Sequence, residues 1–112
     1  MKKILSTLIA LISVNLNAGT YIITNNAETG IGTFSDIYAQ IIANNDSTPN
    51  IEIHEFLSGS VYVDQTYIFK GLRTLSISGN SNANLESKSY LNLRDNVLFE
   101  FEDIQTVSIS NL

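Results

Sequence analysis

Acidic side chains are the residues of this sequence that could do chemistry. Glu52 and Asp64 follow the starts of neighbouring predicted strands, and Glu100, Glu102 and Asp103 lie close together in the chain. A pair of carboxylates can act as general acid and base on a glycosidic bond, and clustered carboxylates can bind Ca²⁺. No spacing like that of an EF-hand loop is present, and acidic residues on the polar face of a strand are ordinary surface residues. We therefore predict no catalytic residue, no cofactor-binding residue and no metal ligand, and we expect that the protein is not an enzyme.

Other motifs that carry chemistry are incomplete. His54 is the only histidine and the sequence has no cysteine, so it lacks the several His or Cys ligands of a typical zinc site. Alternation places His54 on the outer face of a strand, between Ile53 and Glu55, as a solvated surface residue. Gly30 and Gly32 lack the third glycine of a nucleotide-binding loop, and we interpret them as a tight turn.

Tyrosines could form an aromatic surface for sugars or proteins. Tyr62 is the main candidate, because alternation places it outward between Val61 and Val63. The other four are Tyr21, Tyr38, Tyr67 and Tyr90. Exposed tyrosine is also ordinary β-strand composition, so a surface glycan or protein ligand is an expectation only.

The elements that would position these residues are mainly short strands. Residues 21–24 form a first apolar run, and after Pro49 apolar residues alternate with period two, which predicts strands separated by Gly, Asn, Asp and Ser turns. The apolar pairs are Ile51 with Ile53, Val61 with Val63, Leu75 with Ile77, Leu91 with Leu93, and Val107 with Ile109. Residues 98–101 allow two registers, with either Leu98 and Glu100 or Phe99 and Phe101 on one face.

One segment has helical periodicity instead. Apolar residues recur at spacings of three and four, which predicts one buried face of a helix over residues 33–44: Phe34, Ile37, Tyr38, Ile41 and Ile42. Thr33 is the expected N-cap, and Asp36 is its expected partner in an arrangement like a capping box. The helix should end near Asn44 and Asn45, before Pro49.

The first eighteen residues have the pattern of a secretory signal peptide. Lys2 and Lys3 precede an apolar run too short to span a membrane, and the small residue Ala18 precedes Gly19. We therefore predict a signal peptide at residues 1–18 and one domain at residues 19–112, with no transmembrane segment after cleavage. The expected location is the periplasm, the outer membrane or cell surface, or the medium.

The charge of the mature part disfavours anionic partners. Residues 19–112 keep four basic side chains (Lys70, Arg73, Lys88 and Arg94) against eleven acidic ones, a net charge of −7. Because such a surface repels phosphate backbones and anionic lipids, we expect no nucleic-acid binding.

The last residues indicate a strand with an open edge. Residues 106–112 (TVSISNL) alternate like a strand and no capping feature follows them. We expect this edge to belong to the start of something longer or to a truncated remnant, and to allow self-association.

A repeated unit indicates the architecture. Residues 75–80 (LSISGN) and 107–112 (VSISNL) share one pattern, which favours a coiled sheet whose turns stack on one another. The alternative is a small β-meander, since strands linked by hairpins are common.

Three stretches carry a resemblance to a known family. The first is residues 21–25 (YIITN), which lead into residues 30–37 (GIGTFSDI). The second is residues 41–45 (IIANN), followed by residues 48–53 (TPNIEI). The third is the repeated unit. This order resembles the N-terminal portion of secreted right-handed parallel β-helix proteins, such as polymorphic outer-membrane proteins and autotransported adhesins. Ser35 stands where that family usually has Arg, and Ile37-Tyr38 replaces its Ala-Ile pair.

The resemblance implies a mainly β fold in which the helix of residues 33–44 caps the first rungs of an incomplete right-handed parallel β-helix. The function it implies is that of a secreted or cell-surface structural, adhesin-like module without catalytic activity of its own. The alternative is the N-terminal part of a polysaccharide-degrading β-helix enzyme, which would need more rungs to form a groove for a sugar chain.

Overall fold

The computed structural model describes residues 19–88 and 92–112. The predicted signal peptide at residues 1–18 and the predicted candidate Tyr90 lie outside the described residues. The described part is a small, mainly β domain with one α-helix. Within it, no helix combines the length and the apolar character that crossing a bilayer requires.

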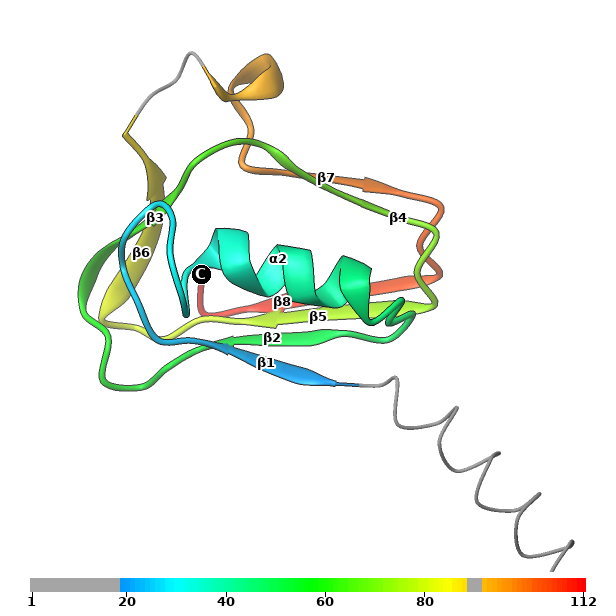
Figure 1. Ribbon diagram of the computed structural model, residues 1–112, viewed down its shortest axis with the longest axis horizontal. Helices are drawn as coiled ribbons and strands as arrows, with labels where there is room; N and C mark the ends of the chain where they lie inside the picture. Colours follow the sequence, from blue (N-terminus) through cyan, green and yellow to red (C-terminus); the bar gives the residue numbers. More distant parts are fainter. Residues whose placement is uncertain (1–18, 89–91) are drawn as a thin grey trace, which may run out of the picture.

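The strands pair in three small sheets, none of them closed (Figure 1). The largest has the order β1-β2-β5-β8 and consists of β1 (Thr20–Ile23), β2 (Asn50–Ile53), β5 (Thr74–Ser78) and β8 (Thr106–Ser110). The second pairs β3 (Gly59–Val63) with β6 (Ala83–Ser87), and the third pairs β4 (Tyr67–Lys70) with β7 (Phe99–Glu102). Every one of these pairs is parallel. The alternative of a β-meander is therefore wrong, because a meander joins consecutive strands in antiparallel pairs.

The chain visits the three sheets in a fixed order. β2, β3 and β4 belong to three different sheets, and β5, β6 and β7 pair with them in the same order before β8 returns to the first sheet. The repeated unit predicted from the sequence is confirmed, since Leu75 aligns with Val107 and Ile77 with Ile109. Figure 1 shows the three sheets around the helix, with β3 and β6 at one end and β4 and β7 opposite the largest sheet.

Inward side chains stack across the largest sheet. Tyr21, Ile51, Ile77 and Ile109 occupy equivalent positions on its four strands. The first three are buried, whereas Ile109 on the last strand is 47% exposed. A side chain in such a stack is covered from both directions when a strand or the helix lies on each side. The face of the domain at β8 is therefore apolar and uncovered in the described part of the chain.

The helix α2 (Phe34–Ala43) begins and ends as predicted. Thr33 is the N-cap: its Oγ1 accepts a hydrogen bond from the Asp36 backbone N–H at 3.3 Å and donates one to the Gly30 carbonyl at 2.6 Å. The Asp36 carboxylate accepts in turn from the Gly32 N–H at 2.9 Å. Asn44 is the C-cap.

The buried face of α2 is narrower than the sequence pattern indicated. Phe34, Ile37 and Ile41 are buried in the core, and the Tyr38 side chain is half-buried. Ile42, predicted to share this face, is 65% exposed. The reason is angular: Ile42 is one residue, about 100° of helix rotation, past Ile41, so it leaves the contact with the sheets.

Aromatic rings join α2 to the third sheet. The Phe34 ring lies 4.9 Å from the Tyr67 ring and 5.2 Å from the Phe99 ring, between centroids, and the Tyr38 ring lies 5.5 Å from Phe69. The Tyr38 hydroxyl also donates to the Ile68 carbonyl at 2.8 Å. These contacts fix α2 against the third sheet, so that the helix lies between the three sheets (Figure 1).

The strand predicted around Leu91 and Leu93 needs correction, and the open choice of register at residues 98–101 is decided by the structure. Leu93, expected in a strand with Leu91, lies in a bend before a short 3-10 turn at Arg94–Asn96, and Leu91 itself lies outside the described residues. Of the two registers for residues 98–101, the one with Phe99 and Phe101 on the inner face is present, since these residues align with Tyr67 and Phe69. Strands β4 and β6 were not predicted.

Candidate functional site

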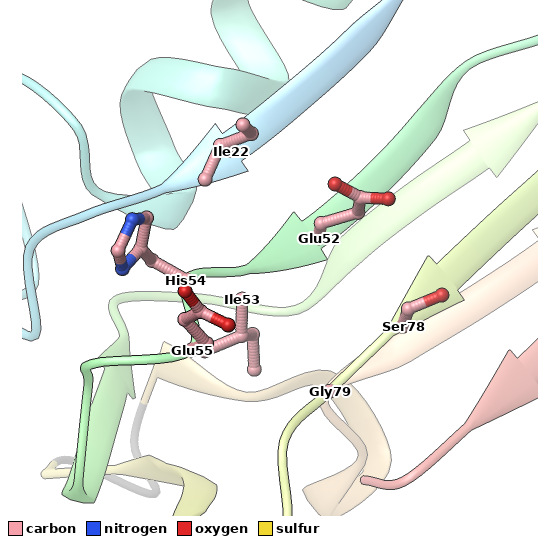
Figure 2. A pocket seen from close by; sticks show the side chains of 7 residues that line it. All are labelled: Ile22, Glu52, Ile53, His54, Glu55, Ser78 and Gly79. Atoms are coloured by element: carbon pink, nitrogen blue, oxygen red, sulfur yellow. The ribbon is translucent and has the colours of Figure 1, made fainter.

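A shallow hollow on the outer face of the largest sheet is the best candidate site (Figure 2). Its cavity volume is about 320 Å³. The lining residues come from β1, β2, the turn after β2, and the end of β5: Ile22, Glu52, Ile53, His54, Glu55, Ser78 and Gly79.

Parallel register brings the central residues together. Ile22 aligns with Glu52 across β1 and β2, and Glu52 aligns with Ser78 across β2 and β5. These three side chains form one row across the outer face, because the inward positions on either side of Glu52 are taken by buried Ile51 and Ile53. The predicted outward position of Glu52 is confirmed. The row combines an apolar side chain, a carboxylate and a hydroxyl group.

The His54 side chain lies near Ile22, at one end of the row (Figure 2). Its Nδ1 accepts a hydrogen bond from the Phe56 backbone N–H at 3.2 Å, and its ring centroid lies 5.0 Å from that of Phe56. Because Nδ1 accepts, the neutral ring carries its proton on Nε2, which is then a donor. His54 is half-buried rather than fully solvated, since the chain turns at this residue: the Leu57 N–H and the Asn80 amide both donate to its carbonyl.

The charge of the hollow is negative. Glu52 and Glu55 are the charged side chains that line it, and no Lys or Arg is among the described lining residues. Among the described residues, the Glu52 carboxylate accepts one hydrogen bond, a long one of 3.4 Å from the Asn50 amide. Its second oxygen can therefore accept from a hydroxyl or amino group of a ligand.

The other predicted acids lie apart from this hollow. Asp64 follows β3, in a different sheet from Glu52, and accepts a hydrogen bond from the Tyr67 hydroxyl. Glu100 pairs with Arg94 at 3.5 Å, and Glu102 pairs with Lys70 at 3.8 Å. Asp103 has a positive φ of 51° in the turn after β7. The structure thus brings neither Glu52 and Asp64 nor the Glu100 cluster into one site. Within residues 19–88 and 92–112, no group of three or more His, Cys, Asp or Glu is placed to hold a metal ion.

Three of the tyrosines are internal rather than on an aromatic surface. The Tyr21, Tyr38 and Tyr67 hydroxyls bind the Asp46 carboxylate, the Ile68 carbonyl and the Asp64 carboxylate. Burial raises the pKa of each phenol, and in Tyr67 the hydrogen bond to Asp64 raises the pKa further. The expectation of a shared tyrosine surface is wrong for these three.

Tyr62 has the outward position predicted for it. It lies between buried Val61 and Val63 on β3, and its side chain is partly exposed. The Lys88 ammonium lies 4.5 Å from the centroid of its ring, so a cation already occupies one ring face.

Sequence reasoning missed several residues of the hollow. Ile22 and Ser78 belong to strands that are distant in the chain, and only the parallel register places them beside Glu52. Glu55 is next to His54 and close to Glu52 in the sequence, so its place in the same hollow could have been predicted. Buried Asp46 was also missed, although the order Asp-Ser-Thr is typical of a turn in which the carboxylate binds the chain two residues later, as it does with the Thr48 N–H at 2.9 Å.

No protein-family model matches this chain, and no curated protein or solved structure is significantly similar to it. The inferences about function below therefore rest on the sequence and on the geometry of the described residues.

Proposed function

We propose that the chain is an exported structural module with an adhesin-like role, built as the capped start of a right-handed parallel β-helix and without catalytic activity of its own. The order of the three sheets along the chain supports the β-helix, since each parallel pair joins equivalent strands of successive turns. Crossover connections between parallel strands are right-handed in about 98% of known cases, which supports the handedness. The aromatic contacts of α2 support its role as the cap of the first turn.

The row formed by Ile22, Glu52 and Ser78 is the observation that carries the binding role. It offers an apolar contact, a carboxylate acceptor and a hydroxyl group within one shallow hollow, with the half-buried His54 ring at its edge. Such a surface suits a neutral or amino sugar, whose ring has an apolar face and a rim of hydroxyl donors. A surface glycan is therefore the ligand we favour over a protein ligand.

Binding of the exported chain to an array of neutral, amino and acidic glycans tests this role. Glu52→Gln should weaken the binding of the best glycan at least about tenfold, since a hydrogen bond to a charged group contributes roughly 1.5–3 kcal/mol. Glu86→Gln is the matched control, because Glu86 lies on β6 in another sheet and should leave binding unchanged. Failure of the wild-type chain to bind any glycan of the array, or equal losses in both variants, would contradict the proposed role.

One observation favours the alternative, a polysaccharide-degrading β-helix enzyme. Glu52, His54 and Glu55 line the same hollow, so three titratable groups face one space. Release of reducing ends or of unsaturated products from acidic and neutral polysaccharides would report such an activity. Turnover that Glu52→Gln abolishes and Asp64→Asn leaves intact would replace the structural role with an enzymatic one.

We also propose self-association through the free edge of β8. β8 is the last strand of its sheet, and its inward side chains Val107 and Ile109 are exposed. A second copy of the chain is the expected occupant, since its own β8 offers the same apolar pair and the same unpaired backbone edge. Light scattering across a concentration series should show dimers that Ile109→Lys removes, while a monomer at every concentration would contradict the proposal.

A further inference from the structure

Asp46 is a buried carboxylate at the junction of α2, β1 and β2. Its residue is only 3% exposed. The Oδ2 atom accepts hydrogen bonds from the Gly19 backbone N–H at 2.8 Å and from the Tyr21 hydroxyl at 2.9 Å, while Oδ1 accepts from the Thr48 N–H at 2.9 Å. All three donors are neutral. The ion pairs found among the described residues join other side chains, so Asp46 has no cationic partner there.

A buried carboxylate held by neutral donors is stabilised further by a nearby positive charge. Removing a charged group from water is strongly unfavourable unless the group is paired or fully hydrogen-bonded. Asp46 also follows the C-terminal end of α2, where the helix dipole adds negative potential and the last turn carries no basic residue. This junction therefore favours a cation, and the only backbone nitrogen on the Asp46 carboxylate that processing of the chain would make cationic is that of Gly19.

We propose that removal of the predicted signal peptide creates an ammonium group on Gly19 that forms a buried ion pair with Asp46 and locks β1 into the domain. In this step an export protease adds water across the amide bond between residues 18 and 19. The Ala18 carbonyl carbon becomes a carboxylate, and the Gly19 nitrogen takes up a proton to become an ammonium group with three N–H donors. The inference rests on the proposed export of the chain, and it is independent of the glycan-binding hollow.

The surroundings of Gly19 fit a new chain end at this position. Its carbonyl accepts a hydrogen bond from the Asn50 N–H at 2.9 Å, so both backbone groups of Gly19 are held by the fold. A Cβ atom at Gly19 would lie 3.0 Å from the Tyr21 hydroxyl oxygen and 3.1 Å from its ring, which is closer than such contacts usually are. A side chain at this position would therefore require the Tyr21 ring to shift, whereas glycine lets the nitrogen stay on Asp46 with the ring in place.

The ion pair predicts a direction for the pH dependence of stability. The titratable groups that face the ammonium are the Asp46 carboxylate and the Tyr21 phenol. The negative Asp46 raises the pKa of the ammonium above its usual value of about 7.7–8.0. Its contribution to stability is then fully present below that usual value and is lost as the pH rises through the raised pKa of the folded chain.

The experiment uses the full-length gene, expressed with export, and the exported product recovered from the cell fractions. Intact mass and N-terminal sequencing should give Gly19 as the first residue. Limited acetylation of the α-amine, followed by mass spectrometry of the N-terminal peptide across a pH series, then gives the pKa of the amine. We expect that pKa to be roughly one unit or more higher in the wild type than in Asp46→Asn, so that acetylation at pH 7.5 is about tenfold slower in the wild type. Asp103→Asn, at an exposed turn, is the matched control and should behave as the wild type does.

Asp46→Asn could fail to fold, so the wild type also supplies its own comparison. The α-amine pKa of the folded exported protein should exceed that of the same protein in denaturant, and complete acetylation should lower the midpoint of thermal unfolding. A different first residue, or an equal α-amine pKa in folded and denatured protein, would overturn the inference. Loss of glycan binding with a raised α-amine pKa would instead count against the proposed adhesin-like role alone.

Discussion

Tyrosine hydroxyls in this molecule have a structural use that their residue type alone does not reveal. Tyr67 is almost fully buried, and its hydroxyl donates to Asp64 at the end of β3. Its ring contacts Phe34 and Tyr38 of the helix. One residue thus joins α2, β3 and β4, and its phenol stays protonated because burial and the neighbouring carboxylate both raise its pKa.

Tyr67→Phe tests the consequence at high pH. The unfolded phenol ionises near pH 10, whereas the folded phenol stays neutral, so the wild type loses stability as the pH rises above about 10. The variant cannot ionise at this position and should lose less stability between pH 9 and pH 11. At pH 7 it should be less stable by about 1 kcal/mol, because Asp64 loses a donor.

Urea unfolding followed by circular dichroism at pH 7, 9 and 11 measures both effects. Tyr62→Phe is the matched control, since that ring lies on the outer face of β3, and its stability should follow the wild-type curve. Parallel pH curves for Tyr67→Phe and the wild type would show that the Tyr67 phenol does not contribute to the alkaline loss.

At the level of elements, the start of α2 depends on one buried side chain. Thr33 is fully buried, and its hydroxyl group both accepts from the Asp36 N–H and donates to the Gly30 carbonyl. The turn before it positions the Gly32 N–H on the Asp36 carboxylate. The N-terminal end of the helix is therefore closed by reciprocal hydrogen bonds, as the sequence predicted.

Thr33→Ala should lower the free energy of unfolding by about 1–2 kcal/mol, because the variant leaves the Asp36 N–H without its side-chain acceptor and removes one of two donors to the Gly30 carbonyl. Thr33→Ser keeps the hydroxyl group and should recover most of the loss. Thr29→Ala, at an exposed position in the preceding turn, is the control and should change stability by less than about 0.5 kcal/mol. Equal stability of Thr33→Ala and the wild type in urea unfolding would rule out a contribution from this cap.

The strands could be predicted where large apolar residues alternate, and not elsewhere. β4 has three apolar residues in succession, Tyr67, Ile68 and Phe69, so its period of two is hidden. β6 alternates, but only one of its inward residues, Leu85, is large and apolar; the other two are Ala83 and Ser87. Leu93 had the right spacing for a strand but lies in a bend, since residues 92–96 bend and turn.

The candidate hollow shows the same limit. Alternation along β2 was enough to place Glu52 on the outer face. It could not give the neighbours of Glu52, because the register that aligns Ile22, Glu52 and Ser78 depends on parallel pairing between segments far apart in the chain. Glu52 and Asp64, the conceivable acid–base pair of the sequence, are not brought together, because consecutive strands lie in different sheets.

At the scale of the whole molecule, burial is unequal along the stack of inward side chains. The helix and the first strands cover Tyr21, Ile51 and Ile77, while β8 covers Ile77 and is itself covered by nothing in the described chain. Ile77 is fully buried and its register partner Ile109 is 47% exposed. Ile77 and Ile109 are therefore the same residue type in equivalent positions, and they differ in whether a neighbouring strand of the described chain covers them on both sides.

Ile77→Ala and Ile109→Ala form a matched pair that measures this difference. In dilute solution, Ile77→Ala should destabilise the domain by about 2–5 kcal/mol, because it removes buried methyl groups and leaves a cavity. Ile109→Ala removes the same atoms from a half-exposed position and should cost less than about 1 kcal/mol. Urea unfolding at a concentration where light scattering shows a monomer gives both values.

The same pair measured at high concentration tests the proposed association through β8. If a second copy covers this face, the cost of Ile109→Ala should rise toward that of Ile77→Ala as dimers form, since burial then becomes similar on both strands. The cost of Ile77→Ala, which is already buried in the monomer, should stay nearly constant. A small cost for Ile109→Ala at every concentration would mean that β8 remains uncovered, whereas a large cost in the monomer would mean that other residues of the same chain cover it.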